Sequence, residues 1–263
     1  MAVDRIGHHQ KLQVSRERLL NLQNKNIEPL TEELFKVLNK KRDFQISELE
    51  SILNKGVDPD ARDETLSTPL IIVSRLGDYD AVKLLIEKGA DVNARDLYGA
   101  SAVYHASRNG SYEVVNLLIE KGAKVNVLDM SGYTPLCLAL ENIGLVPRCY
   151  EVAKLLIEKG ADPNLHFEGD SIPLICALKK RSNDLAKLLI ERGADVNASE
   201  YHDEITPLMY AVLRNDIEMA RLLIKKDAKV NVQSIACSNP LKIALSTNNE
   251  ELINLLKSNG AVE

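Results

Sequence analysis

The residue types that most often act as nucleophiles, bases and metal ligands are scattered along this chain. The five histidines are His8, His9, His105, His166 and His202, and the four cysteines are Cys137, Cys149, Cys176 and Cys237. No two histidines stand four residues apart on a predicted helix, and none lies beside a cysteine at metal-ligand spacing. His8 and His9 could bind a metal only opportunistically. We therefore predict neither a specific metal site nor a cofactor.

Sequence motifs of catalysis are also missing: the chain has no Gly-rich phosphate loop, no Gly-x-Ser-x-Gly elbow and no kinase signature. Cys149 lies in an irregular segment and could act as a nucleophile with a distant histidine as base. A cysteine of a loop or of the core is the favoured interpretation. Asp91, Asp162 and Asp195 recur at one position of a repeated turn, which indicates turn formation. We predict that the chain is not an enzyme.

The composition predicts a folded, helical protein. Of 263 residues 45% are hydrophobic, only 4% are aromatic and none is Trp, which disfavours a β-sandwich or barrel. The net charge of −5 arises from interspersed Lys and Glu without a basic stripe, so nucleic acid is not an expected partner. No segment approaches the roughly 20 apolar residues of a membrane span, and no secretory signal is visible. We expect a cytoplasmic protein with reduced cysteines and no membrane partner.

One phrase repeats along the chain and sets its organisation. Leu-Leu-Ile-Glu-Lys-Gly-Ala-Asp-Val-Asn ends at Asn93, and close copies end at Asn126, Asn164 and Asn197, with weaker copies near Asn231 and Gly260. The glycine position of this phrase recurs at Gly89, Gly122, Gly160, Gly193, Asp227 and Gly260, with spacings of 33, 38, 33, 34 and 33 residues. An earlier echo begins at Gly56. The structural unit is therefore 33 residues long.

A second phrase keeps step with the first and predicts where helices begin. Thr-Pro-Leu or a variant of it starts at Thr68, Thr134, Ile172, Thr206 and Asn239. Thr caps a helix well, and Pro fits the first helical position. The following helix, such as residues 112–121, is too apolar for a single buried face, so neighbouring units must cover it on both sides. The units should stack into a solenoid.

The 33-residue period, with Thr-Pro-Leu before an apolar helix and Gly-Ala-Asp-Val-Asn after it, resembles the ankyrin repeat over residues 33–263. The resemblance implies an all-α solenoid of stacked helix-turn-helix units with β-turn fingers. On this basis residues 1–30 form an N-terminal extension and residues 31–61 an N-terminal capping repeat. Six repeats follow at 62–94, 95–127, 128–165, 166–198, 199–232 and 233–263.

The departures from the family pattern predict local differences. The family usually has His after Thr-Pro-Leu, but here the position holds Ile71, Tyr104, Cys137, Ile175, Met209 and Lys242, so the hydrogen bonds of that His should be missing. About five extra residues around 144–149 should bulge between two helices, at the end away from the fingers. Residues 15–23 read as a short helix outside the repeats.

In ankyrin-like proteins the fingers and the exposed side of the inner helices line a concave groove where partners usually bind. The candidate partner-binding residues, placed by their offset from Thr-Pro-Leu, are Arg75, Arg95, Leu97, Tyr98, Arg108, Leu128, Met130, Tyr133, Phe167 and Tyr201. Apolar residues on consecutive fingers are typical of an interface centre, although each could instead pack locally between fingers. The three arginines would select an acidic or hydrogen-bonding partner.

The resulting hypothesis is a non-catalytic scaffold, monomeric on its own, that binds a partner protein or peptide in the groove. Two alternatives stay open at the level of sequence. One is an enzyme or enzyme regulator that acts through the N-terminal tail or the 144–149 insertion. The other is a microbial effector that occupies a host target and is intracellular after delivery to a host cell. Because fold does not fix function, the sequence does not identify the partner.

Overall fold

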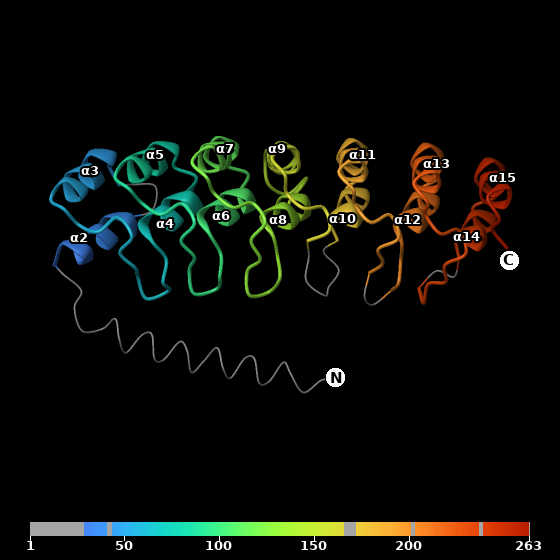
Figure 1. The fold of residues 1–263 in the computed structure, drawn as a ribbon, viewed down its shortest axis with the longest axis horizontal. Coiled ribbons are helices and arrows are strands. Elements are labelled where there is room, and N and C mark those ends of the chain that lie inside the picture. Colours follow the sequence, from blue (N-terminus) through green and yellow to red (C-terminus); the bar gives the residue numbers. More distant parts are fainter. Residues whose placement is uncertain (1–28, 41–43, 166–171, 201–202, 237–238, 263) are drawn as a thin grey trace, which may run out of the picture.

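The computed structural model describes residues 29–40, 44–165, 172–200, 203–236 and 239–262. Within these ranges it contains fourteen helices and no strand, which confirms the all-α prediction. The helices come in antiparallel pairs stacked side by side. In Figure 1 the second helix of each pair lies in the upper row, the first helix of each full repeat lies beneath it, and the connecting loops project below. We call these the outer helices, the inner helices and the fingers.

From α4 onward each pair lies within one of the predicted repeats, whereas α2 begins two residues before the predicted capping repeat. The N-terminal pair is α2 (Pro29–Leu38) and α3 (Ile46–Asn54). The next three pairs are α4 (Pro69–Leu76) with α5 (Tyr79–Glu87), α6 (Ala102–Arg108) with α7 (Tyr112–Glu120), and α8 (Pro135–Glu141) with α9 (Cys149–Glu158). The last three are α10 (Pro173–Lys179) with α11 (Asn183–Glu191), α12 (Pro207–Leu213) with α13 (Ile217–Lys225), and α14 (Pro240–Ser246) with α15 (Glu250–Ser258). The short helix expected at residues 15–23 lies outside the described residues.

The helix-start signals act as predicted. Thr68 and Thr134 accept hydrogen bonds from the backbone N–H groups of Ile71 and Cys137, at 3.4 and 3.1 Å, and Pro follows each Thr. These bonds satisfy donors that the first helical turn leaves unpaired. Ser101 opens α6 without a side-chain cap. Among the described residues its hydroxyl is one of two buried side-chain groups without a hydrogen-bond partner.

The repeated glycine ends the outer helices in the left-handed conformation, as predicted, except after α13, where Asp227 takes this conformation with φ of +67°. The φ angles of Gly89 and Gly122 are +92° and +89°, a region that a residue with a Cβ rarely adopts. The turn aspartates are structural too. Asp91 Oδ1 accepts the Asn93 N–H at 2.8 Å, and the same turn recurs at Asp162 and Asp195. These aspartates recur because the turn requires them, as predicted, and not because they form a catalytic array.

An asparagine ladder joins successive repeats. Asn126 donates from Nδ2 to the Gly160 carbonyl at 3.1 Å and accepts the Asp162 N–H at Oδ1 at 2.8 Å. Each member therefore bonds to the turn of the next repeat through both ends of its amide. The other members, with the same pair of bonds, are Asn93, Asn164, Asn197 and Asn231. The repeated phrase that sets the period of the sequence therefore also fixes the spacing of the repeats in the structure.

The outer helices are buried on both sides, as the stack requires. In α7 the side chains of Val114, Val115 and Leu118 are at most 1% exposed, and Leu117 is 8% exposed. Leu156 holds the position of Leu118 in the following repeat and is fully buried. One continuous apolar core runs from Leu34 to Ala261. Each repeat thus depends on its neighbours for burial.

The extra residues of the third repeat form a loop at 142–148 between α8 and α9. Since this loop follows the C-terminal end of an inner helix, it lies at the end away from the fingers, as predicted. Arg148 pairs with both carboxylate oxygens of Glu113, at 2.6 and 2.7 Å, and stacks over the Tyr112 ring. A Cβ on Gly110 would approach the Pro147 carbonyl oxygen to 2.0 Å, so only glycine fits there. The loop is therefore fixed to the preceding repeat.

Candidate protein-binding surface

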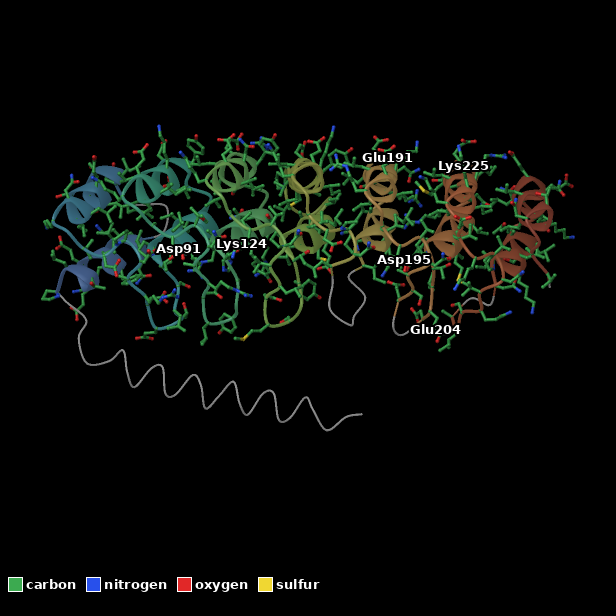
Figure 2. All side chains as sticks on the ribbon, in the orientation of Figure 1. Asp91, Lys124, Glu191, Asp195, Glu204 and Lys225 are labelled. Carbon is green, nitrogen blue, oxygen red and sulfur yellow. The ribbon has the colours of Figure 1, made fainter. Side chains whose placement is uncertain are left out.

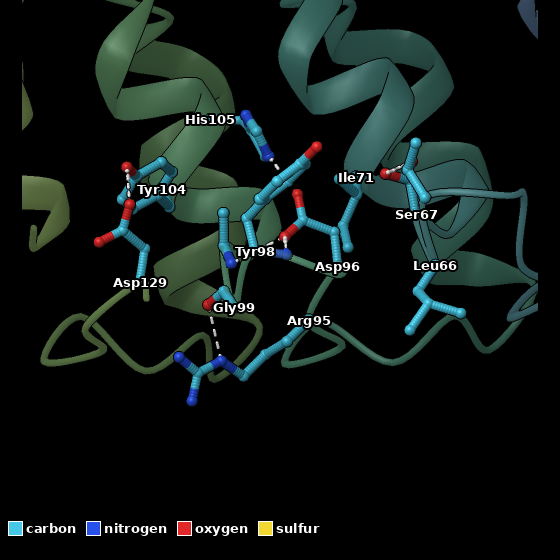
Figure 3. Close-up of polar contacts among 12 residues, drawn as sticks. Leu66, Ser67, Ile71, Arg95, Asp96, Tyr98, Gly99, Tyr104, His105 and Asp129 are labelled. Carbon is cyan, nitrogen blue, oxygen red and sulfur yellow. Dashed lines mark hydrogen bonds and ion pairs between the residues drawn. The ribbon is translucent and has the colours of Figure 1, made fainter. Parts of the chain in front are cut away.

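The fingers of the first three repeats are built around an aspartate. Asp96 Oδ1 accepts the backbone N–H groups of Tyr98 and Ala100, both at 2.9 Å, which closes the turn (Figure 3). Asp63 and Asp129 occupy the equivalent positions and make the equivalent bonds. A short acidic side chain at this position converts a flexible loop into a turn of defined shape.

The second carboxylate oxygen fixes the finger to an inner helix. Asp96 Oδ2 lies 2.9 Å from His105 Nε2, and Asp129 Oδ2 accepts the Tyr104 hydroxyl at 2.6 Å (Figure 3). The Asp96 side chain is only 4% exposed. Burial first, and then the hydrogen bond to Asp129, raise the pKa of Tyr104 well above its ordinary value. Tyr104 stands where the family usually has His, so a different side chain ties the finger at this site.

Two arginines link successive fingers. Arg62 Nη1 donates to the carbonyls of Leu66 and Arg95, both at 2.8 Å. Arg95 repeats this arrangement: Nε donates to the Gly99 carbonyl at 2.7 Å, and Nη2 donates to the Leu128 carbonyl. Arg95 thus donates these hydrogen bonds to backbone carbonyl groups of its own finger and of the next one. The expected role of Arg95 in selecting the partner stays a prediction.

The tips of the second and third fingers carry the most exposed of the predicted apolar residues. Tyr98 is 57% and Met130 is 55% exposed. Their backbones are joined, because the Met130 N–H donates to the Tyr98 carbonyl at 2.9 Å, while the Leu97 N–H donates to the Thr65 carbonyl of the first finger at 2.8 Å. We call Tyr98 and Met130 the fingertip pair. It presents two large apolar side chains to solvent on a hydrogen-bonded scaffold.

The remaining finger residues are placed differently. Leu97 and Leu128 are half-buried. Tyr133 is half-buried as well and packs against a small cluster of Ala100, Tyr104 and Leu138. The packing of Tyr133 matches the alternative that a finger residue packs locally. The other two predicted residues, Phe167 and Tyr201, lie outside the described residues.

Arg75 and Arg108 are exposed at equivalent positions in the last turns of α4 and α6. Asn109 Nδ2 donates to the Arg75 carbonyl at 2.8 Å, which ties the ends of the two helices together. Figure 2 shows the division of the surface: Glu191 and Lys225 lie along the outer helices, whereas Glu204 lies on a finger. The structure therefore brings together the fingers and the inner helices, which carry the predicted residues.

Comparison with known proteins decides the family. The family model described as "Ankyrin repeats (3 copies)" matches residues 41–129, 99–167, 129–200, 150–234 and 174–262. These matches overlap and together cover most of the chain. The chain is an ankyrin repeat protein. Ankyrin repeat domains are generally protein–protein interaction modules.

Two solved ankyrin repeat domains share the fold. The ankyrin repeat domain of Bcl-3, described as a unique member of the IkappaB protein family, has a TM-score of 0.66 at 24% identity, over 88% of this chain and 99% of that one. The human ASB11 ankyrin repeat domain has a TM-score of 0.62 at 23% identity, over 90% of this chain and all of that one. At these identities the likeness shows the fold alone. No curated protein matches the chain.

The cysteines of this ankyrin repeat protein that the structure describes belong to its core. Cys149 is 1% exposed, and its Sγ lies 3.8 Å from the Ser107 carbonyl. Burial raises the pKa of the Cys149 thiol, and it raises the pKa of Cys176 to about 12. A thiol that stays protonated is a poor nucleophile. The interpretation of Cys149 as a core cysteine is therefore confirmed.

The described ranges lack two other kinds of site. No group of three His, Cys, Asp or Glu side chains there could hold a metal ion. None of the helices in those ranges combines the length and hydropathy that a membrane crossing requires.

Two surface features of the C-terminal repeats are absent from the predicted set of partner-binding residues. Ile235, on the last finger, is 77% exposed, and it holds the offset of Met130, four residues before the helix-opening residue. Extending the same offset to the sixth repeat would have found it. The second feature is a group of cations, Lys180, Arg181 and Arg214, around the ends of α10 and α12. Lys180 and Arg214 are 34 residues apart in the sequence, which is close to the length of one repeat.

Proposed function

We propose that this ankyrin repeat protein is a non-catalytic binding module that holds a partner protein against its fingers and inner helices. The exposed fingertip pair, joined through its backbone, is the observation that carries the proposal. Tyr and Met are enriched where protein interfaces bury most surface. Because hydrogen bonds already fix the finger backbones, binding orders little further chain, which favours affinity.

Arg75 and Arg108 supply the polar part of this surface. Both are exposed, and both lie on inner helices one repeat apart. Guanidinium groups at the end of the inner helices away from the fingertip pair would orient a partner along the surface and select one of complementary charge. Leu97 and Leu128, which are half-buried on the same two fingers, would help to exclude water from the interface.

Affinity capture with three proteins tests the proposal. The wild type, the fingertip variant Tyr98→Ala/Met130→Ala and the control Lys83→Ala/Lys154→Ala would be incubated with the same lysate. The two control lysines are exposed on α5 and α9. We expect the wild type and the control to retain the same protein and the fingertip variant to lose it. Loss with the control but not with the fingertip variant would place the partner on the outer helices and contradict the proposal.

A further inference from the structure

Three cations gather where the inner helices of the fourth and fifth repeats end. Lys180 follows the last residue of α10, Arg181 adopts a left-handed conformation with φ of +56°, and Arg214 follows the last residue of α12. The Ser182 N–H donates to the Ala177 carbonyl at 2.9 Å, which fixes the turn that carries the first two. We call Lys180, Arg181 and Arg214 the basic cluster.

Arg214 is held in place by the repeat before it. Its Nη2 donates to the Lys179 carbonyl at 2.7 Å, and its guanidinium carbon lies 5.9 Å from the centre of the Tyr210 ring. Lys179 Nζ lies 5.8 Å from the same ring and pairs with Glu200, whose other oxygen accepts the Tyr210 hydroxyl at 2.8 Å. Stacking and hydrogen bonding thus orient Arg214 before any ligand arrives.

Two nearby carboxylates, Glu200 and Asp216, already have partners. The Glu200 side chain is 4% exposed and is bound by Lys179 and Tyr210. Asp216 accepts the Met219 N–H at 2.9 Å and the Asn183 amide at 2.6 Å. Burial and the neighbouring Arg181 lower the pKa of Arg214. The attraction of Asp216 for the guanidinium raises this pKa and is too weak to offset those two effects.

The basic cluster differs from those surface cations that pair with carboxylates. Arg148 pairs with Glu113, and Arg221 pairs with Glu251. No ion pair among the described residues includes a member of the basic cluster. A chain with a net charge of −5 thus keeps a local excess of positive charge at one end of two inner helices.

We propose that the basic cluster binds a run of aspartate or glutamate side chains on the partner protein. This inference rests on the proposed function and specifies the chemistry of the partner. Guanidinium groups bind carboxylates through two parallel hydrogen bonds. Because the three cations are spread over two repeats, whose inner helices lie about 8 to 10 Å apart, they suit several carboxylates along a chain better than one compact anion. A nucleic acid would need a longer row of cations than these three.

The test is a titration of fluorescein-labelled deca-glutamate, followed by fluorescence polarisation at low salt. The cluster variant is Lys180→Gln/Arg181→Gln/Arg214→Gln, and the matched control is Lys83→Gln/Lys154→Gln/Lys187→Gln, which removes the same charge from exposed positions of outer helices. We expect the cluster variant to bind at least about tenfold more weakly than the wild type and the control to change by less than about threefold. Circular dichroism spectra should show that both variants keep their helices.

Three outcomes would overturn the inference. The first is a wild type that does not bind deca-glutamate, and the second is an equal loss in the cluster variant and in the control. The third is tighter binding of a single-phosphoserine peptide, with its charge matched to that of a shorter glutamate peptide, which would identify a phosphate site. The fingertip variant Tyr98→Ala/Met130→Ala should bind deca-glutamate as the wild type does. The peptide titration therefore tests the proposal for the basic cluster, and the affinity capture of the partner tests the proposed function.

Discussion

At the scale of single residues, two aspartates hold the second and third fingers in shape. Asp96 and Asp129 use one carboxylate oxygen to close a turn and the other to bind an inner helix. Such buried acceptors are costly to leave without partners, so the whole arrangement must form together. The fingertip pair owes its fixed position to these acids, although neither acid touches the proposed partner.

The pKa shifts of buried groups predict a loss of stability at alkaline pH. Burial raises the pKa values of the Cys137, Cys149 and Cys176 thiols and of the Tyr104 hydroxyl. In the unfolded chain thiols and tyrosines ionise near about 8.5 and 10. Above those values the unfolded state binds fewer protons than the folded state, so the free energy of unfolding must fall as pH rises. Below about pH 8 these groups contribute no pH dependence.

Urea denaturation under reducing conditions, at pH values from 7 to 11, measures this effect. We expect a constant free energy of unfolding up to about pH 8 and a progressive fall above it. The variant Tyr104→Phe cannot ionise at this position, so its decline above pH 10 should be shallower. A stability that stays constant or rises between pH 9 and 11 would show that these groups ionise as easily in the folded protein as in the unfolded chain.

At the scale of elements, the asparagine ladder explains why the repeats keep a fixed spacing. Replacing Asn126 by Ala removes two hydrogen bonds between the second and third full repeats. We expect a loss of about 1 to 3 kcal/mol in the free energy of unfolding, because two hydrogen bonds of about 0.5 to 1.5 kcal/mol each are removed. The control Asn116→Ala removes only an exposed contact with Glu120 and should cost less than about 0.5 kcal/mol. Equal losses in urea denaturation would show that the ladder contributes no special stability.

The elements were predictable from sequence to different degrees. The inner helices begin at their Thr-Pro signals, and the outer helices end at the repeated glycine, because local chemistry dictates both. The packing of Tyr133 was not predictable, since it depends on Tyr104 and Leu138, which approach it only in the folded stack. The two bonds of Arg95 across the fingers were missed for the same reason. Its recurrence 33 residues after Arg62 was the available signal.

At the scale of the whole molecule, stability is shared between neighbours. Leu118 and Leu156 are fully buried in successive outer helices. We expect Leu118→Ala or Leu156→Ala to lower the free energy of unfolding by about 2 to 5 kcal/mol, through lost burial and the cavity left behind. Because a solenoid has only nearest-neighbour interfaces, the thermal transition should broaden or divide into two steps. An unchanged melting curve for both variants would contradict the assignment of the core.

The whole molecule is a stack of repeats that presents the fingertip pair at the ends of two fingers. The repeat fold followed from the period in the sequence, but the binding surface did not follow with equal certainty, because the same offsets contain packed residues and exposed residues. Leu97, Leu128 and Tyr133 are half-buried, whereas Tyr98 and Met130 project into solvent. Only the structure separates these groups. It therefore reduces the predicted apolar patch to a pair that can be tested without disturbing the fold.

The central claim is that the fingertip pair lies at the centre of the interface with a partner protein. The most direct test is the dissociation constant of the captured partner for the wild type, for Tyr98→Ala/Met130→Ala and for the control Lys83→Ala/Lys154→Ala, measured by isothermal titration calorimetry. Loss of two central anchors should cost at least about 2 kcal/mol, which is a roughly thirtyfold rise in the dissociation constant. The control should stay within about threefold of the wild type, and all three proteins should melt at nearly the same temperature. An unchanged dissociation constant for the fingertip variant, with its fold intact, would contradict the account.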